Sequence, residues 1–351
     1  MRITDVDTQW LERSLDLESG SVSNLSYEGV GAGQVADTYR ISFDRDGVRA
    51  DSLVLKITSR DESSSSTGRS EQNYLREVRF YQDLMESVKV RSPRCFHAEI
   101  TDDATEFALL LEDLSPCTIG DQLVGCTIAE AELVVDEAVK LHAPVWGAPQ
   151  LKELPWLPTV RSFGAAELAY WPKVMDRVRA RFDGEIDEEL LKVGDVFYQN
   201  AAGYLELQRR APWTLQHGDF RPDNLLFGAN AGSVPVAVLD WQTVQRGPGV
   251  LDLSFFISGA LTTELRRAHE RELVARYHDG LRALGVLDYS LDDCWRDYVR
   301  FSFQGYFVGV GAAMSVKQTA RGDQVFASMI RRAGQHILDL DALSELSAVR
   351  A

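Results

Sequence analysis

The chain has 351 residues, of which 45% are hydrophobic, so it is long enough for two packed lobes and does not have the composition of a disordered protein. Its 37 Lys and Arg residues are outnumbered by 53 Asp and Glu residues, which gives a net charge of −16. This balance argues against a nucleic-acid or membrane partner, because nucleic-acid backbones and anionic membranes are themselves negative.

The cysteines and the N-terminus favour a cytoplasmic protein. The four cysteines show no C-x-x-C spacing, which predicts reduced thiols rather than a disulfide framework or a metal site. Asp5 and Asp7 stand where a signal peptide would have its apolar core. The most apolar window, residues 301–316, is shorter than a membrane span.

The sequence pattern of the N-terminal part predicts strands. An alternating pattern runs from Leu25 into a glycine cluster that includes Gly31 and Gly33, and it resumes at residues 38–43. Glycines between strands usually form only a turn, but they also let backbone amides approach an anion such as phosphate.

The next strand, residues 52–57, is apolar except for Lys56. A lysine on a surface strand would be unremarkable in itself, but a buried amine needs a partner of opposite charge. The helical stripe that follows, around residues 74–84, is separated from this strand by the serine-rich residues 61–70. That composition predicts a mobile loop, either a plain linker or a lid.

Residues 107–114 read as a buried strand, and helical periodicity dominates from residue 129 onward. We therefore place a lobe boundary near residue 115, between an N-terminal lobe of residues 1–115 and a C-terminal lobe of residues 116–351. The helices expected in the second lobe are 130–142, 163–182, 187–209, 262–284, 291–316 and 323–346.

Residues 215–227 contain most of the candidate catalytic side chains. Asp219 follows His217 by two positions, Asn224 follows Asp219 by five, and Asp240 ends the apolar run that comes next. A single Asp on a loop is usually a turn residue or a cap, but the spacing of all these residues argues against coincidence. Phosphoryl transfer from a nucleotide needs one carboxylate to orient the acceptor hydroxyl, and an amide oxygen with a second carboxylate to hold magnesium on the phosphates.

The motif His-Gly-Asp-Phe-Arg-Pro-Asp-Asn, with the later Asp240, resembles the catalytic loop and metal-binding Asp of protein kinases. It is more similar to the aminoglycoside phosphotransferase and choline kinase superfamily, and most to its ecdysteroid-kinase-like branch. The resemblance implies an α+β, protein-kinase-like fold of two lobes, with a small N-terminal antiparallel sheet lobe and a larger, mainly helical C-terminal lobe. Trp241 and Gln242 replace the usual Phe-Gly, and only twelve positions separate Asp240 from Asp252, so no activation segment fits.

The resemblance also implies roles in the C-terminal lobe. Asp219 would be the catalytic carboxylate, and Asn224 and Asp240 would be ligands of Mg²⁺. Arg221 would either neutralise phosphate charge or pair with Asp223. His217 would fix the loop structurally, and Asp252 would brace it.

For the nucleotide, the resemblance implies that ATP lies against the N-terminal lobe. Lys56 would contact its phosphates and pair with a helix glutamate, for which Glu77 is preferred over Glu71 and Glu86. Gly31 and Gly33 would cover the phosphates. Glu112 and Leu114 would lie in a hinge whose backbone pairs with adenine.

The implied function is ATP-dependent transfer of the γ-phosphate to a hydroxyl of a small-molecule acceptor. Two aromatic groups are candidates for the acceptor pocket, although aromatic residues at helical spacing are more often core; if they line it, an apolar alcohol is favoured. The candidates are Trp156, Tyr170, Trp171, Trp295, Tyr298, Phe301 and Tyr306. The alternatives are a kinase of another acceptor class (aminoglycoside, hydroxyacyl thioester, sugar or choline-like) and a non-catalytic nucleotide-binding scaffold.

Overall fold

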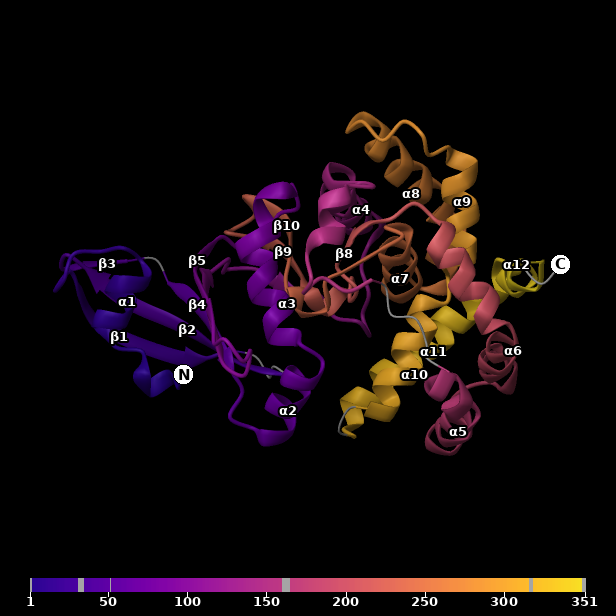
Figure 1. Ribbon diagram of the computed structural model, residues 1–351, viewed down its shortest axis with the longest axis horizontal. Coiled ribbons are helices and arrows are strands. Elements are labelled where there is room, and N and C mark those ends of the chain that lie inside the picture. The colour runs from indigo at the N-terminus through magenta and orange to yellow at the C-terminus, as the bar shows by residue number, and fades with distance from the viewer. Residues whose placement is uncertain (1, 31–34, 51, 160–164, 316–317, 349–351) are drawn as a thin grey trace. The chain divides into compact units, whose positions relative to one another are not determined.

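The computed structural model describes residues 2–30, 35–50, 52–159, 165–315 and 318–348. An antiparallel sheet occupies the N-terminal part and helices make up most of the remainder, so the α+β class predicted from the sequence is confirmed (Figure 1). The chain forms two compact units. Unit 1 comprises Met1–Ser87, Arg91–Cys117 and Gly228–Val244, and unit 2 comprises Val88–Val90, Thr118–Phe227 and Gln245–Ala351.

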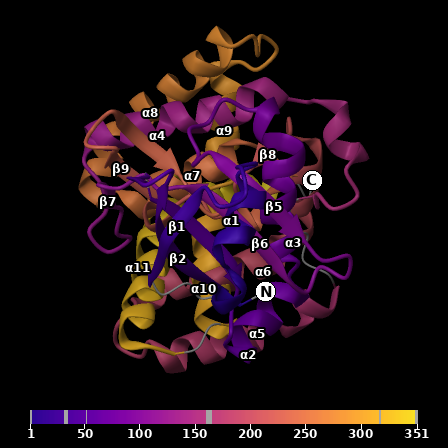
Figure 2. The ribbon, with the colours of Figure 1, turned by 90° about the vertical axis from the view of Figure 1, so that its left-hand side faces the viewer.

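Unit 1 is built on an antiparallel sheet (Figure 2). The strands lie in the order β1 (Val22–Gly29), β2 (Ala36–Arg45), β4 (Leu53–Thr58), β6 (Phe107–Glu112) and β5 (Cys95–Ile100), with β3 (Val48–Arg49) paired to β2. In β4 the fully buried Leu55 and Ile57 alternate with half-buried residues, as expected for a strand with one face in the core. Lys56 therefore points to the other face.

Helices α1 (Thr8–Ser14) and α3 (Asn73–Arg79) pack against opposite faces of this sheet. Helix α1 begins at Asp7, whose side chain accepts a hydrogen bond from the Trp10 backbone, and it adds Trp10 and Leu11 to the cluster formed with Leu55. Helix α3 contacts β5 and β6 and continues into a π-helical turn, η2 (Phe80–Leu84).

The expectation of a loop at residues 61–70 is wrong, because Glu62–Ser70 form helix α2. Asp61 caps this helix by accepting a hydrogen bond from the Ser64 backbone, and Ser65 and Gly68 are buried. The cap and this packing outweigh the weak helix propensity of serine.

The end of unit 1 comes from a later part of the chain. Strand β9 (Leu225–Ala229) pairs with β7 (Thr118–Ile119) in unit 2 and runs on into unit 1, where β10 (Val234–Val238) and the 3₁₀ turn η7 (Trp241–Thr243) follow. Asp240 thus belongs to unit 1.

Unit 2 is mainly helical. Its helices are α4 (Ile128–His142), α5 (Ala165–Arg181), α6 (Glu188–Arg210), α7 (Val250–Ala260), α8 (Thr263–Ala283), α9 (Leu291–Arg300), α10 (Gln304–Ser315), α11 (Ala320–Asp339) and α12 (Ala342–Ala348). Strand β8 (Thr214–Gln216), which leads into the motif at residue 217, pairs with β11 (Gln245–Gly247). Every residue of α7 is buried.

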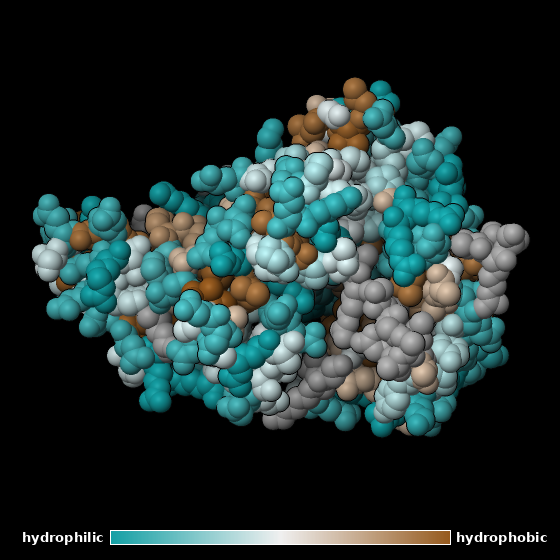
Figure 3. Space-filling model, viewed as in Figure 1, coloured by the Kyte–Doolittle hydropathy of each residue, from teal (hydrophilic) through white to brown (hydrophobic). Residues whose placement is uncertain are grey.

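Exposed leucines mark the turn between α8 and α9, where Figure 3 shows a hydrophobic patch; they are Leu284, Leu287 and Leu291. None of the helices in the described part of the chain combines the length and the apolar character that a membrane span requires.

Candidate active site

Lys56 is the centre of an ion cluster in unit 1. Its Nζ lies 2.7 Å from the Glu77 carboxylate and 2.9 Å from Oδ1 of Asp240. Strand β4 supplies the lysine, helix α3 the glutamate, and the end of β10 the aspartate. The structure therefore brings together three side chains that are widely separated in sequence, with one ammonium between two carboxylates.

Burial and charge act in opposite directions on this cluster. Burial lowers the pKa of Lys56, but the attraction of Asp240 and Glu77 outweighs it and raises the pKa above its ordinary value. Burial raises the pKa of Glu77 to about 7, since the charge of Asp240 adds to burial and Lys56 offsets them only in part. The cluster thus has one carboxylate more than its single cation can balance.

Asp240 is held in an unusual backbone conformation. Its φ is 67° and its ψ is 72°, in the left-handed region that residues other than glycine seldom adopt. Its Oδ2 accepts a hydrogen bond of 2.9 Å from Gln242. The next residue, Trp241, stacks on Phe80 with ring centroids 3.8 Å apart and donates to Ser92. These contacts fix the turn to the end of α3, the helix that carries Glu77.

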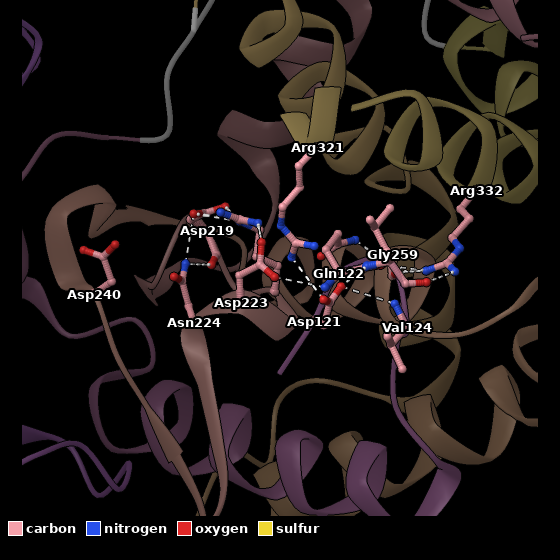
Figure 4. A network of polar contacts seen from close by, with 12 residues as sticks. Asp121, Gln122, Val124, Asp219, Asp223, Asn224, Asp240, Gly259, Arg321 and Arg332 are labelled. Atoms are coloured by element: carbon pink, nitrogen blue, oxygen red, sulfur yellow. Dashed lines mark hydrogen bonds and ion pairs between the residues drawn. The ribbon is translucent and has the colours of Figure 1, made fainter. Parts of the chain in front are cut away.

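The motif residues of unit 2 form a compact loop (Figure 4). Gly218 has a φ of 83°, which lets the chain turn between the buried His217 and Asp219. The Asp219 carboxylate accepts hydrogen bonds from Arg221 Nε at 2.9 and 3.1 Å and from Asn224 Nδ2 at 2.9 Å. Its backbone N–H donates to His217 Nδ1 at 3.2 Å.

Arg221 pairs with two carboxylates. Besides its bonds to Asp219, its Nη1 donates to Asp223. Burial tends to lower the pKa of Arg221, but the two carboxylates outweigh it and raise the pKa further above its ordinary value. The ion pair with Asp223, one of the two alternatives left open by the sequence, is present, and a contact of Arg221 with phosphate stays a prediction.

Asp252 lies beneath the start of the loop. Its Oδ2 accepts from the His217 backbone at 2.7 Å and its Oδ1 accepts from the Gly218 backbone at 3.0 Å. His142 also contacts Oδ2, at 3.2 Å, and its other ring nitrogen lies 2.8 Å from the Tyr277 hydroxyl. His142 could not be predicted from the sequence, because it ends the apolar helix α4 and gives no local signal of this long-range contact.

Four further residues were predicted to contact the nucleotide. Gly31 and Gly33 lie outside the described residues. Glu112 forms a bidentate ion pair with Arg91, both distances being 2.9 Å, and the Leu114 carbonyl accepts from the Asn230 backbone. The Glu112 backbone N–H donates to the Arg94 carbonyl at 2.8 Å, so both this group and the carboxylate are committed within unit 1.

Most of the aromatic acceptor candidates are core residues. Trp171, Tyr298, Phe301 and Tyr306 are buried, and the Tyr306 hydroxyl donates to the Leu190 carbonyl. Trp295 instead lines a surface cavity of about 620 Å³, beneath the guanidinium of Arg271. Tyr170 is exposed and Trp156 is half-buried. The four buried rings therefore give no support for an apolar pocket, and for the other three the role stays a prediction.

The donor set suits a hard cation. Asn224 uses its amide nitrogen on Asp219, and this orientation leaves the amide oxygen as its candidate ligand atom. Asp240 supplies carboxylate oxygens from the cluster that carries surplus negative charge, and oxygen donors are those that Mg²⁺ prefers. Among the described residues, no group of three or more His, Cys, Asp and Glu side chains forms a metal site. Each of these two residues therefore carries an oxygen donor of the kind that Mg²⁺ prefers.

An antiparallel sheet with a buried Lys–Glu pair, together with a mainly helical unit carrying a His-Gly-Asp loop, defines a protein of the kinase-like class. The chain belongs to the phosphotransferase enzyme family (APH), whose family model matches residues 26–287. The superfamily predicted from the motif is confirmed, whereas its ecdysteroid-kinase-like branch stays a prediction.

Solved structures of kinases share this fold. A GDP complex of a mutant aminoglycoside 2′-phosphotransferase-IIIa is 17% identical, covers 97% of this chain and 96% of its own, and has a TM-score of 0.54. A Plasmodium vivax ethanolamine kinase is 11% identical, covers 95% of this chain and 88% of its own, and has a TM-score of 0.53. These confirm the kinase-like fold. A comparison with curated proteins found no match.

Proposed function

We propose that the protein transfers the γ-phosphoryl group of ATP to a hydroxyl group of a small molecule. The observation that carries the proposal is Lys56, held between Glu77 and Asp240 in a member of a phosphotransferase family. A lysine fixed in this way is pre-positioned to receive the negative charge of phosphate oxygens. Residues 1–115 would form the nucleotide-binding lobe and residues 116–351 the lobe with the acceptor site.

Each side chain of the site would have its own role in the transfer. Lys56 would bind phosphate oxygens of the nucleotide, while Glu77 keeps the amine charged and aimed. Asn224 and Asp240 would hold Mg²⁺, which when bound neutralises phosphate charge. Asp219 would orient the acceptor hydroxyl and take its proton late in the transfer. Since Arg221 is paired with two carboxylates, its main role would be to fix Asp219.

The nucleotide is further proposed to contact Gly31 and Gly33 near its phosphates. The backbone at Glu112 and Leu114 would pair with the base. GTP remains an alternative to ATP, because GDP is the nucleotide bound in the aminoglycoside phosphotransferase complex described above.

The acceptor class is the open choice within this proposal. Four of the seven candidate aromatic residues are core residues, which weakens the support for an apolar alcohol. Aminoglycosides and ethanolamine, named for the similar structures, carry both hydroxyl and amine groups. The acidic chain would attract such cations, whereas it would not attract an anionic hydroxy acid.

The test is an acceptor screen with γ-labelled ATP or GTP in the presence and absence of Mg²⁺. The panel contains amino alcohols, aminoglycosides, sterols, sugars and hydroxyacyl thioesters, and Asp219→Asn serves as the control. We expect magnesium-dependent labelling of at least one alcohol by the wild type and none by the variant. Nucleotide binding without turnover across the whole panel would instead support a non-catalytic scaffold.

A further inference from the structure

A short segment of unit 2 packs directly against the motif loop. We call residues 118–126 the brace. Its first residues form β7, which pairs with β9, and the Gly120 backbone donates to the Leu225 carbonyl at 3.0 Å. A Cβ atom at Gly120 would lie 2.2 Å from the Pro222 carbonyl oxygen. Only glycine can therefore occupy this position without moving the loop.

The brace also contacts the charged side chains of the loop. The Gln122 backbone N–H donates to Asp223 Oδ1 at 2.9 Å, and Asp223 Oδ2 accepts from Arg221. Arg221 in turn holds both oxygens of Asp219. An unbroken series of hydrogen bonds thus runs from the brace to the proposed catalytic carboxylate (Figure 4).

Helix α11 contacts the other side of the brace. Arg332 Nη1 donates to the Gln122 carbonyl at 3.1 Å and to the Gly259 carbonyl at 2.7 Å, and its Nη2 donates to the Leu123 carbonyl at 3.1 Å. Nearer the start of α11, Arg321 pairs with Asp121 at 3.1 Å. Both arginines point at the brace in Figure 4.

Arg332 is an unusual anchor. Its three hydrogen bonds in the described structure all go to backbone carbonyls, and burial, with the nearby charge of Arg331, lowers its pKa. A planar guanidinium can hold three carbonyls in fixed directions, which an ammonium on a flexible stem cannot do. The contact therefore sets the position of the brace rather than merely balancing charge.

We infer that Asp223 and Arg332 are positioning residues for phosphoryl transfer, which act on Asp219 through the brace. The inference rests on the proposed function, in which Asp219 orients the acceptor. A displacement of about 1 Å at a reacting group can lower a rate by about 100-fold, so a small shift of the brace would be measurable in kcat.

The kinetic test compares Asp223→Asn, Arg332→Lys and the double variant, with Arg331→Lys as the matched control. Arg331 is the neighbouring arginine on α11 and donates to the Glu185 carbonyl, away from the brace. We expect each single variant to lower kcat by about 10-fold to 100-fold while KM for ATP changes by less than about 3-fold. Because the two residues act in series, the double variant should be no slower than about the slower single variant. Unchanged kcat, or two effects that multiply, would overturn the inference.

Amide hydrogen exchange tests the same coupling without any need for activity. Arg332→Lys should speed exchange in residues 217–224, and Arg331→Lys should leave that exchange at the wild-type rate. Equal protection of residues 217–224 in Arg332→Lys and wild type would overturn the inference. A wild type that transfers no phosphate would end the proposed function, while the exchange result would still decide the role of the brace.

Discussion

Lys56 contacts two carboxylates with one ammonium, and the raised pKa of Glu77, about 7, reflects this imbalance of charge. This imbalance is tolerable if a further cation binds at Asp240, which is what a magnesium site would supply. The spacing of the motif predicted Asp219, Asn224 and Asp240 as site residues, and the structure brings Asn224 into contact with Asp219 because both lie on one short loop. Their chemical roles stay predictions. The contacts of His142 and Arg332 could not be predicted, since each depends on how distant helices pack.

Asp240→Ala should abolish magnesium-dependent turnover and leave folding nearly intact. Its removal leaves Lys56 and Glu77 as a balanced pair, and this gain offsets the slightly poorer fit of alanine to the left-handed backbone, so the melting temperature should stay within a few degrees of wild type. The measurements are Mg²⁺ titration of the reaction rate and thermal unfolding. His217→Ala is the contrasting variant, because it should loosen the loop but keep a magnesium-dependent rate. Full magnesium-dependent activity in Asp240→Ala would refute the metal assignment.

Glu77 predicts a pH dependence of stability. Its pKa is about 7 in the folded protein against an ordinary 4.5, so the folded state keeps a proton that the unfolded chain has already lost between these values. The free energy of unfolding of the wild type should therefore fall as the pH rises through this window and level off above it. Glu77→Gln cannot titrate, so the free energy of unfolding of the wild type should fall relative to that of the variant by about 3 kcal/mol across the window. A difference that is independent of pH in chemical denaturation would contradict the raised pKa.

Among the helices, α8 and α11 are joined by a buried arginine. Arg266 is 1% exposed and pairs with Glu270 of its own helix and with Asp339 of α11. Its removal would leave two carboxylates without their buried partner, and such a loss is costly even though a buried ion pair itself adds little stability.

Arg266→Met should therefore lower the free energy of unfolding by about 3 to 5 kcal/mol, as measured by denaturant unfolding. Arg267→Met is the matched control, because Arg267 pairs with the same Asp339 but is half exposed. Its loss should cost no more than about 1 kcal/mol. Equal losses in the two variants would show that burial does not decide the effect.

Periodicity predicted the existence of most helices but not their breaks. The helix expected at 291–316 is two helices, α9 and α10, separated at residues 301–303, where Phe301 and Phe303 are fully buried in the turn. The helix expected at 323–346 also breaks, into α11 and α12, at Asp341 with its φ of 50°. Helix α7 was not anticipated, since a segment buried on every side has no amphipathic pattern.

At the scale of the whole molecule, each of the two units is built from several segments of the chain, which alternate along the sequence. Residues 228–244 return to unit 1 and bring Asp240 to Lys56, while the motif at residues 217–224 remains in unit 2. The sequence boundary near residue 115 rested on a change of composition, which cannot reveal such a return; as a lobe boundary it stays a prediction.

The most direct test of this account is the magnesium-dependent hydrolysis of ATP by purified protein, compared between wild type and Asp219→Asn. We expect slow hydrolysis by the wild type that requires Mg²⁺ and falls by at least about 100-fold in the variant, with ATP binding retained. Hydrolysis at the wild-type rate in Asp219→Asn would contradict the account, because the reaction would then not depend on the carboxylate that the loop holds in place.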